Sequence, residues 1–153
     1  MAESCPISPV RIDEHAVRST AGLVAAITAV AAFLPGPWRA AVFLALAVDF
    51  AIRGFVAPRF SPIGRLGAVT AARLWPQPHP TDAAPKLFAA RVGVVFALGA
   101  GLSFALGAVG TGIVFAAVLF LAAFLEAAFA LCIGCKVYAL LPEQVARFVA
   151  QAR

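Results

Sequence analysis

The sequence is poor in charge. Asp, Glu, Lys and Arg make up 12% of its 153 residues, whereas 63% of the residues are hydrophobic. A soluble domain needs about a quarter of its residues charged to cover its surface. This shortage argues against an ordinary soluble domain. Together with long apolar runs, it predicts one compact domain in a bilayer.

The sequence also lacks the motifs of the common enzyme classes. It has no phosphate-binding loop, nucleophile triad, zincin motif or nucleotide fingerprint. The first 19 residues carry several charges and no short apolar core, so we expect no cleaved signal peptide. Its three cysteines are an odd number, which does not fit a secreted disulfide scaffold.

Four apolar runs are long enough to cross a bilayer as helices, which takes about 20 residues each. Pro35-Gly36-Pro37 ends the first run, Pro58 stops the second, and a glycine cluster at 107–112 divides the last two. We therefore predict an all-α integral membrane four-helix bundle of two transmembrane hairpins, as one domain over residues 1–153. The spans are expected at about 16–34, 38–57, 89–109 and 112–135, with a cytoplasmic loop at 58–88.

Two further helices are predicted outside the spans. Ser61-Pro62 is typical of a helix start, and Ile63, Leu66, Thr70 and Leu74 follow at helical spacing. This pattern indicates a short basic helix at the membrane interface, between the two hairpins. The tail from Pro142 is also expected to form an amphipathic helix.

The basic residues predict the orientation. Arg39 alone belongs to the side with the short hairpin turns, whereas the other side holds most of the Arg and both Lys residues. By the positive-inside rule both termini are cytoplasmic, in a bacterial inner membrane. Topology explains the net charge of +5 better than nucleic-acid binding does, so no nucleic-acid partner is expected.

The two hairpins resemble each other weakly. The run HAVRSTAGLVAAITAVAAF from His15 is similar in length to FAARVGVVFALGAGLSFAL from Phe88, with Arg18 and Arg91 similarly placed. Each run is followed by a span that carries one acid, Asp49 or Glu126. This pattern favours two related hairpins around a pseudo-two-fold axis. The competing interpretation is that any two Ala-rich spans look alike.

Three charged residues fall inside predicted spans. Asp49 and Arg53 are four residues apart and so share a helix face, and Glu126 is expected at a similar depth. Because ionisable groups in a bilayer usually pair in the bundle interior, we predict one Asp49–Arg53–Glu126 cluster. It would serve as a proton relay or anion site, or would simply lock the helices together.

Cys132 and Cys135 form a Cys-x-x-Cys at the expected cytoplasmic end of the fourth span, on the same side as Cys5. One interpretation is thiol redox or sulfur chemistry by these three residues. A helix C-terminus would disfavour the thiolate, unless Gly134 ends the helix between the cysteines. A second is a metal site completed by His15. A third is close packing of small residues.

Three stretches resemble a bacterial membrane family catalogued as domain of unknown function 4395. They are CPISPVRIDEHAVR, RGFVAPRFSPIGRL and FLEAAFALCIGCKVYALL, and together they cover nearly the whole chain. The resemblance implies a role in thiol or sulfur metabolism beside thioredoxin-like or sulfurtransferase proteins. It supports Cys5, Cys132 and Cys135 as the candidate site, and it supplies no substrate and no cofactor.

The leading hypothesis is therefore a membrane thiol-disulfide oxidoreductase or sulfur-handling protein that works with such a partner. The alternatives are a small-solute or ion transporter, which would require a homo-oligomer to form a pore, and a structural assembly subunit.

Overall fold

The protein is described by a computed structural model over residues 11–140, apart from the side chains of Cys135 and Tyr138. It is helical, as predicted, with a short two-stranded ladder that the sequence did not indicate. The α-helices are α1 (Glu14–Ala31), α2 (Gly36–Ala51), α3 (Pro62–Leu74), α4 (Ala83–Ala105), α5 (Val109–Phe129) and α6 (Ile133–Leu140). A π-helical turn η1 (Ile52–Val56), a 3-10 turn η2 (Pro58–Phe60) and strands β1 (Arg11–Asp13) and β2 (Pro80–Asp82) complete the described chain.

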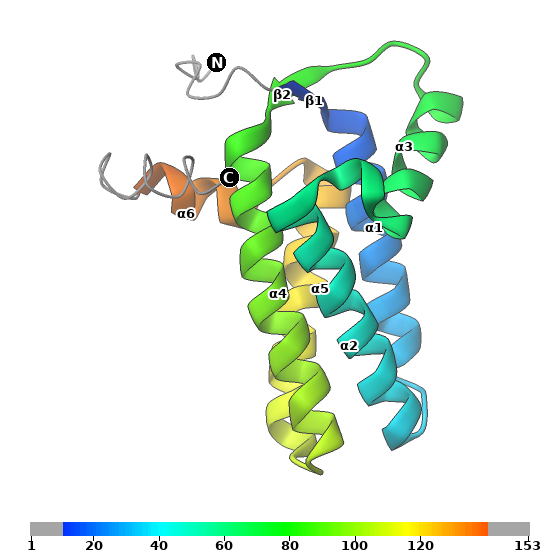
Figure 1. Ribbon diagram of the computed structural model, residues 1–153, viewed down its shortest axis with the longest axis vertical. Helices are drawn as coiled ribbons and strands as arrows, with labels where there is room; N and C mark the ends of the chain where they lie inside the picture. The colour runs from blue at the N-terminus through cyan, green and yellow to red at the C-terminus, as the bar shows by residue number, and fades with distance from the viewer. Residues whose placement is uncertain (1–10, 141–153) are drawn as a thin grey trace.

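Four long helices, α1, α2, α4 and α5, run side by side (Figure 1). The α1–α2 and α4–α5 turns lie together at one end of this bundle. The strands, α3 and α6 lie at the other end (Figure 1). The two hairpins thus point the same way, which is the arrangement expected from the sequence.

The predicted breaks are found, but several boundaries move. Gly107 has a positive φ of 78°, which glycine tolerates, and it separates α4 from α5 where the glycine cluster predicted a turn. Ser61 caps α3 as predicted, because its Oγ accepts a hydrogen bond from the Gly64 N–H at 2.8 Å. The third helix begins at Ala83 instead of residue 89, so the loop at 58–88 is shorter than expected.

The hairpins pack across each other. α2 packs mainly on α4, and α1 packs equally on α5 and α3, while α1 and α2 share far less contact. Ala97 and Ala100 are fully buried, which lets the backbones approach closely, and the rings of Phe43 and Phe104 lie 5.5 Å apart. The core is therefore built of alanine with a few aromatic rings.

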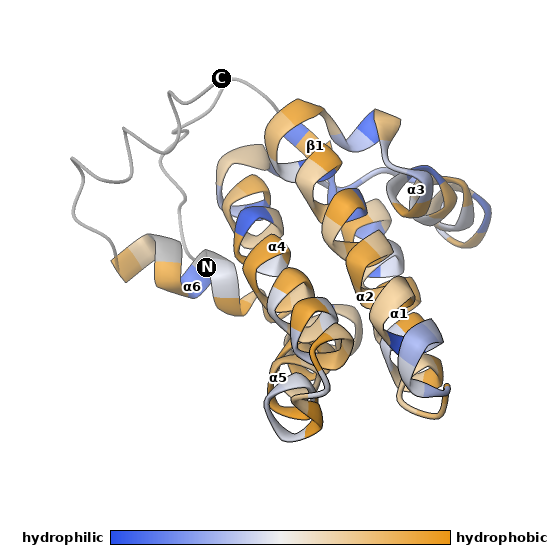
Figure 2. Ribbon diagram, turned by 60° about the horizontal axis from the view of Figure 1, so that its bottom comes forward, coloured by the Kyte–Doolittle hydropathy of each residue, from blue (hydrophilic) through white to orange (hydrophobic). Residues whose placement is uncertain are grey.

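The outer surface of the bundle is apolar. Figure 2 shows hydrophobic residues along most of α4 and α5. Large side chains such as Leu102, Ile113 and Leu121 are about half exposed. Within residues 11–140, α4 and α5 are the two helices long and apolar enough by themselves to cross a membrane. These features agree with membrane association.

The two halves of the chain are built alike. β1 precedes α1 and β2 precedes α4, and the strands pair antiparallel with Ile12 opposite Thr81 at the centre. The Arg18 guanidinium donates to the carbonyl of Ala127 near the end of α5, and the Arg91 Nε donates to the carbonyl of Gly54 just after α2.

The two short helices, α3 and α6, are placed alike in the two halves. α3 packs on α1, and α6 packs on α4. A Cβ added at Gly67 of α3 would lie 2.0 Å from Thr20 Oγ1, and one added at Gly134 of α6 would lie 2.6 Å from Ala89 Cβ. Thr20 and Ala89 occupy corresponding places, each seven residues after the N-cap aspartate of its helix (Asp13 or Asp82). The two halves therefore share an architecture, but not the register of the repeat expected from the sequence, which matched Arg18 with Arg91 and hence Thr20 with Gly93.

Candidate functional site at the α5–α6 junction

The Cys-x-x-Cys does not lie at the end of the fourth long helix. α5 ends at Phe129, and Ala130 adopts the left-handed conformation with φ 53°. The chain then enters α6 at Ile133, directly after Cys132. The predicted span at 112–135 was therefore too long, and the break comes at Ala130 and not at Gly134.

This break places Cys132 at a helix N-terminus and not at a helix C-terminus. Cys132 immediately precedes the first residue of α6, and its carbonyl accepts the Lys136 N–H at 3.1 Å. A helix N-terminus stabilises negative charge, so this position favours a thiolate instead of opposing it. The same geometry is found at Ser61, which directly precedes α3.

Cys132 is partly buried and is disulfide-bonded. Cys5 and the side chain of Cys135 lie outside the described part of the chain, so the predicted three-thiol face stays a prediction. The structure places one of its three members, Cys132.

Asp49 and Arg53 form the predicted buried pair. Asp49 Oδ2 lies 2.7 Å from Arg53 Nη2, and the two side chains are 6% and 11% exposed. The contact is an ion pair between residues four apart on one helix. The guanidinium also lies 4.3 Å from the centre of the Phe50 ring, a cation–π contact.

The other Asp49 oxygen holds the start of α3. Asp49 Oδ1 accepts the Ser61 hydroxyl at 2.6 Å and the Ile63 N–H at 3.2 Å. The Asp49 carboxylate therefore joins α2 to the N-terminus of α3, with Ser61 as the shared cap. This arrangement is a packing anchor at the end of the first hairpin.

Glu126 does not join this pair, which corrects the single cluster predicted from the sequence. Its Oε1 instead bonds to Lys86 Nζ, from the first turns of α4. Both side chains are nearly buried, at 8% and 11% exposed. Within the described residues, Glu126 Oε2 is buried without a hydrogen-bond partner.

Lys86 was missed because the sequence assigned it to a loop. It lies within α4, since that helix starts at Ala83, three residues earlier. Asp82 in the N-cap position and Pro85 in the first turn are typical of a helix start and could have revealed this. The α4 face that carries Lys86 then points at α5, where Glu126 is.

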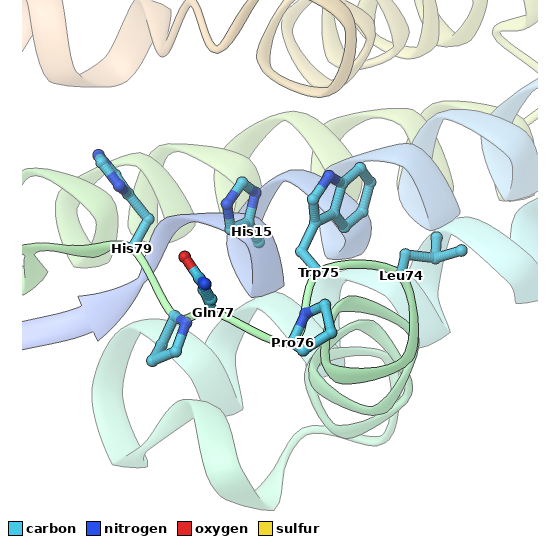
Figure 3. A pocket seen from close by; sticks show the side chains of 7 residues that line it. His15, Leu74, Trp75, Pro76, Gln77 and His79 are labelled. Atoms are coloured by element: carbon cyan, nitrogen blue, oxygen red, sulfur yellow. The ribbon is translucent and has the colours of Figure 1, made fainter.

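His15 lies at the same end of the bundle, in an open cleft of about 420 Å³. Its ring stacks on Trp75 with the centres 5.1 Å apart, while His79 and Gln77 line the same cleft (Figure 3). In the described part of the chain no three His, Cys, Asp or Glu side chains group closely enough to hold a metal ion. A metal site with His15 therefore has no support among these residues.

Comparison with known proteins gives a family. A domain of unknown function, DUF4395, matches residues 12–143. The chain belongs to this family. The match covers every described helix, and the family description assigns no activity. No curated protein and no solved structure matches the chain.

Proposed function

We propose that this DUF4395 protein is a four-span membrane protein whose thiols exchange disulfides or sulfur on the cytoplasmic side. Four spans are supported by the side-by-side arrangement of α1, α2, α4 and α5 (Figure 1). α2 has 16 residues and runs directly into the five residues of η1, which together approach the length needed to cross a bilayer. α1, with 18 residues, is close to that length.

The orientation follows from the ends of this bundle. The end with α3, α6 and the strands holds Arg18, Arg65, Arg73 and Lys136, whereas the opposite end holds Arg39. By the positive-inside rule the first end is cytoplasmic, in an inner membrane, with both termini on that side. α3, with Arg65 and Arg73, would lie along the membrane surface.

The observation that carries the redox proposal is the disulfide at Cys132. Because a cytoplasm keeps thiols reduced, we expect a disulfide on this side to be reversibly reduced and re-formed, and not to be a permanent structural disulfide. The N-terminus of α6 favours the thiolate that attacks or leaves during exchange.

In the proposed reaction, the pair Cys132 and Cys135 exchanges with a thioredoxin-like dithiol, and Cys5 resolves mixed disulfides. A thiolate of the partner attacks the Cys132 disulfide, and its second thiolate then attacks the mixed disulfide. The protein gains two thiols and the partner leaves as a disulfide, so two electrons and two protons are transferred. A sulfurtransferase partner that carries a persulfide would instead pass on its outer sulfur: a thiolate of this protein attacks that sulfur, the S–S bond of the partner breaks, and the partner leaves as a thiolate.

The direct test is to count thiols in cells. Lysates are quenched in acid, labelled with a mass tag for free thiols, and compared before and after a diamide pulse and recovery. We expect the number of tagged thiols to fall by two and then return, with Cys132→Ser abolishing the change. Constantly reduced thiols would overturn the proposal. A thioredoxin active-site variant that lacks its resolving cysteine should trap the wild-type chain and not Cys132→Ser.

A further inference from the structure

The buried Lys86–Glu126 pair lies beside the start of α6. Lys86 and Ala89 are three residues apart on one face of α4, and α6 sits on that face through Gly134. Glu126 reaches the same face from α5 through its bond to Lys86. Cys132 is two residues from Gly134, which contacts α4 at Ala89, and six residues from Glu126 in the chain.

The first half of the chain also has a buried acid close to the start of a short helix. There the buried acid Asp49 accepts a hydrogen bond from Ser61, the residue that caps α3. In the second half, Glu126 is the buried acid of α5, and Cys132 is the residue directly ahead of α6. A disulfide sulfur has no proton to donate, and Glu126 Oε2 has no hydrogen-bond partner within the described residues.

From these contacts we infer that Glu126, held by Lys86, accepts the proton of the Cys132 thiol when that thiol becomes the attacking thiolate. The inference rests on the proposed function and assigns its proton acceptor. Glu126 Oε2 is the free acceptor, and Lys86 keeps the carboxylate in place through Oε1. A general base must have such a free oxygen close to the proton that it removes.

Other charges surround the junction and belong in the design of the test. From α1, Arg18 donates to the carbonyls of Ala127 and Ala128. From α4, Arg91 donates to the carbonyl of Gly54. Lys136, on α6 itself, is exposed.

The experiment follows one exchange step in full-length protein in lipid nanodiscs. The double change Cys5→Ser and Cys135→Ser leaves Cys132 as the single thiol. Oxidised glutathione is added and the mixed disulfide is followed by intact mass. Glu126 accepts the thiol proton, the Cys132 thiolate attacks one glutathione sulfur, and the leaving glutathione thiolate takes up the proton. Each turn consumes one disulfide and forms one mixed disulfide and one glutathione thiol.

We expect Glu126→Gln to slow this reaction at least tenfold at pH 6.5 and less than threefold at pH 9, where hydroxide can remove the proton. Glu126→Asp should restore part of the rate. The neutral pair Glu126→Gln with Lys86→Met should show the same pH-dependent defect without leaving a buried charge. Glu14→Gln, on α1 at the same end of the bundle, is the matched control and should behave as the parent.

Three results would overturn the inference: an unchanged or faster rate at pH 6.5 for Glu126→Gln, an equal loss at both pH values, or an equal loss in Glu14→Gln. If the single-thiol protein with Cys5→Ser and Cys135→Ser, which is the parent in this experiment, fails to react even at pH 9, this result overturns the proposed function as well. A parent that reacts normally while Glu126→Gln shows no pH-dependent defect overturns only the role of Glu126.

Discussion

The two halves of the molecule share one plan and differ in their polar groups. In the first half, Asp49 is matched by Arg53, Ser61 and the Ile63 N–H. In the second half, Glu126 Oε1 contacts Lys86, and Glu126 Oε2 has no hydrogen-bond partner among the described residues. Ser61 precedes α3, and a disulfide-bonded Cys132 precedes α6.

This difference distinguishes a buried acid with a structural role from a buried acid with a role in the proposed reaction. A buried acid with partners on several elements holds those elements together, whereas a buried acid with a single partner contributes less to packing and calls for another explanation. We therefore assign Asp49 and Arg53 to anchoring α3, and Glu126 to the exchange reaction. The single cluster predicted from the sequence is replaced by two ion pairs, one in each half of the chain.

The largest effect should come from removing the anchor. Asp49→Ala leaves Arg53 buried without a counter-ion and removes the acceptor at the start of α3, so we expect a loss of about 3–5 kcal/mol in the free energy of unfolding. The measurement is denaturant unfolding of purified protein in micelles, followed by tryptophan fluorescence.

Its control removes both charges together. Asp49→Asn with Arg53→Met should recover much of the stability, because no unpaired charge is then buried. Glu126→Ala should cost less than Asp49→Ala, since Glu126 has fewer partners to strand. Equal losses at the two acids would remove the distinction between an anchoring half and a reactive half.

A medium effect is expected where the short helices touch the bundle. In Gly67→Ala the new Cβ would lie 2.8 Å from the Thr20 backbone nitrogen, and in Gly134→Ala it would lie 2.8 Å from Ala89 Cα. Both backbones must shift, at a cost of about 1–3 kcal/mol each. Gly110→Ala, with nothing within 4 Å of the added Cβ, should leave stability unchanged.

The two glycine variants should differ in one readout. Gly134→Ala displaces α6 and should alter the rate at which Cys132 of the reduced protein reacts with iodoacetamide. Gly67→Ala displaces α3 and should not. If both variants changed that rate alike, the site would depend on the whole bundle and not on the α4–α6 contact.

The smallest effect is expected at Ser61. Ser61→Ala removes the cap of α3 and one hydrogen bond to Asp49, at a cost of about 1 kcal/mol. Ser61→Thr keeps the hydroxyl and is the control. The unfolding midpoints of both variants give the comparison, and a Ser61→Ala protein as stable as the parent would show that Asp49 holds α3 without the cap.

The sequence predicted the fold well where local chemistry decides it. Pro35-Gly36-Pro37, the glycines near residue 107 and the Ser61-Pro62 start all act on their immediate neighbours, so their effects can be anticipated. The π-helical turn at Ile52–Val56, the β1–β2 ladder and the end of α5 at Ala130 were missed. Alanine has no preference for the left-handed conformation, so no residue marked that end.

The sequence by itself determined an apolar helical chain, the turns of its two hairpins and the residues that can ionise inside it. Only the tertiary structure decided which of them pair. Asp49 and Arg53 share a helix, so their pair follows from spacing alone. Glu126 and Lys86 lie forty residues apart and meet because α4 packs on α5, a contact that depends on the whole bundle. The structure also turns the chain at Ala130, where no residue type marks a helix end, and this turn places Cys132 at the start of α6.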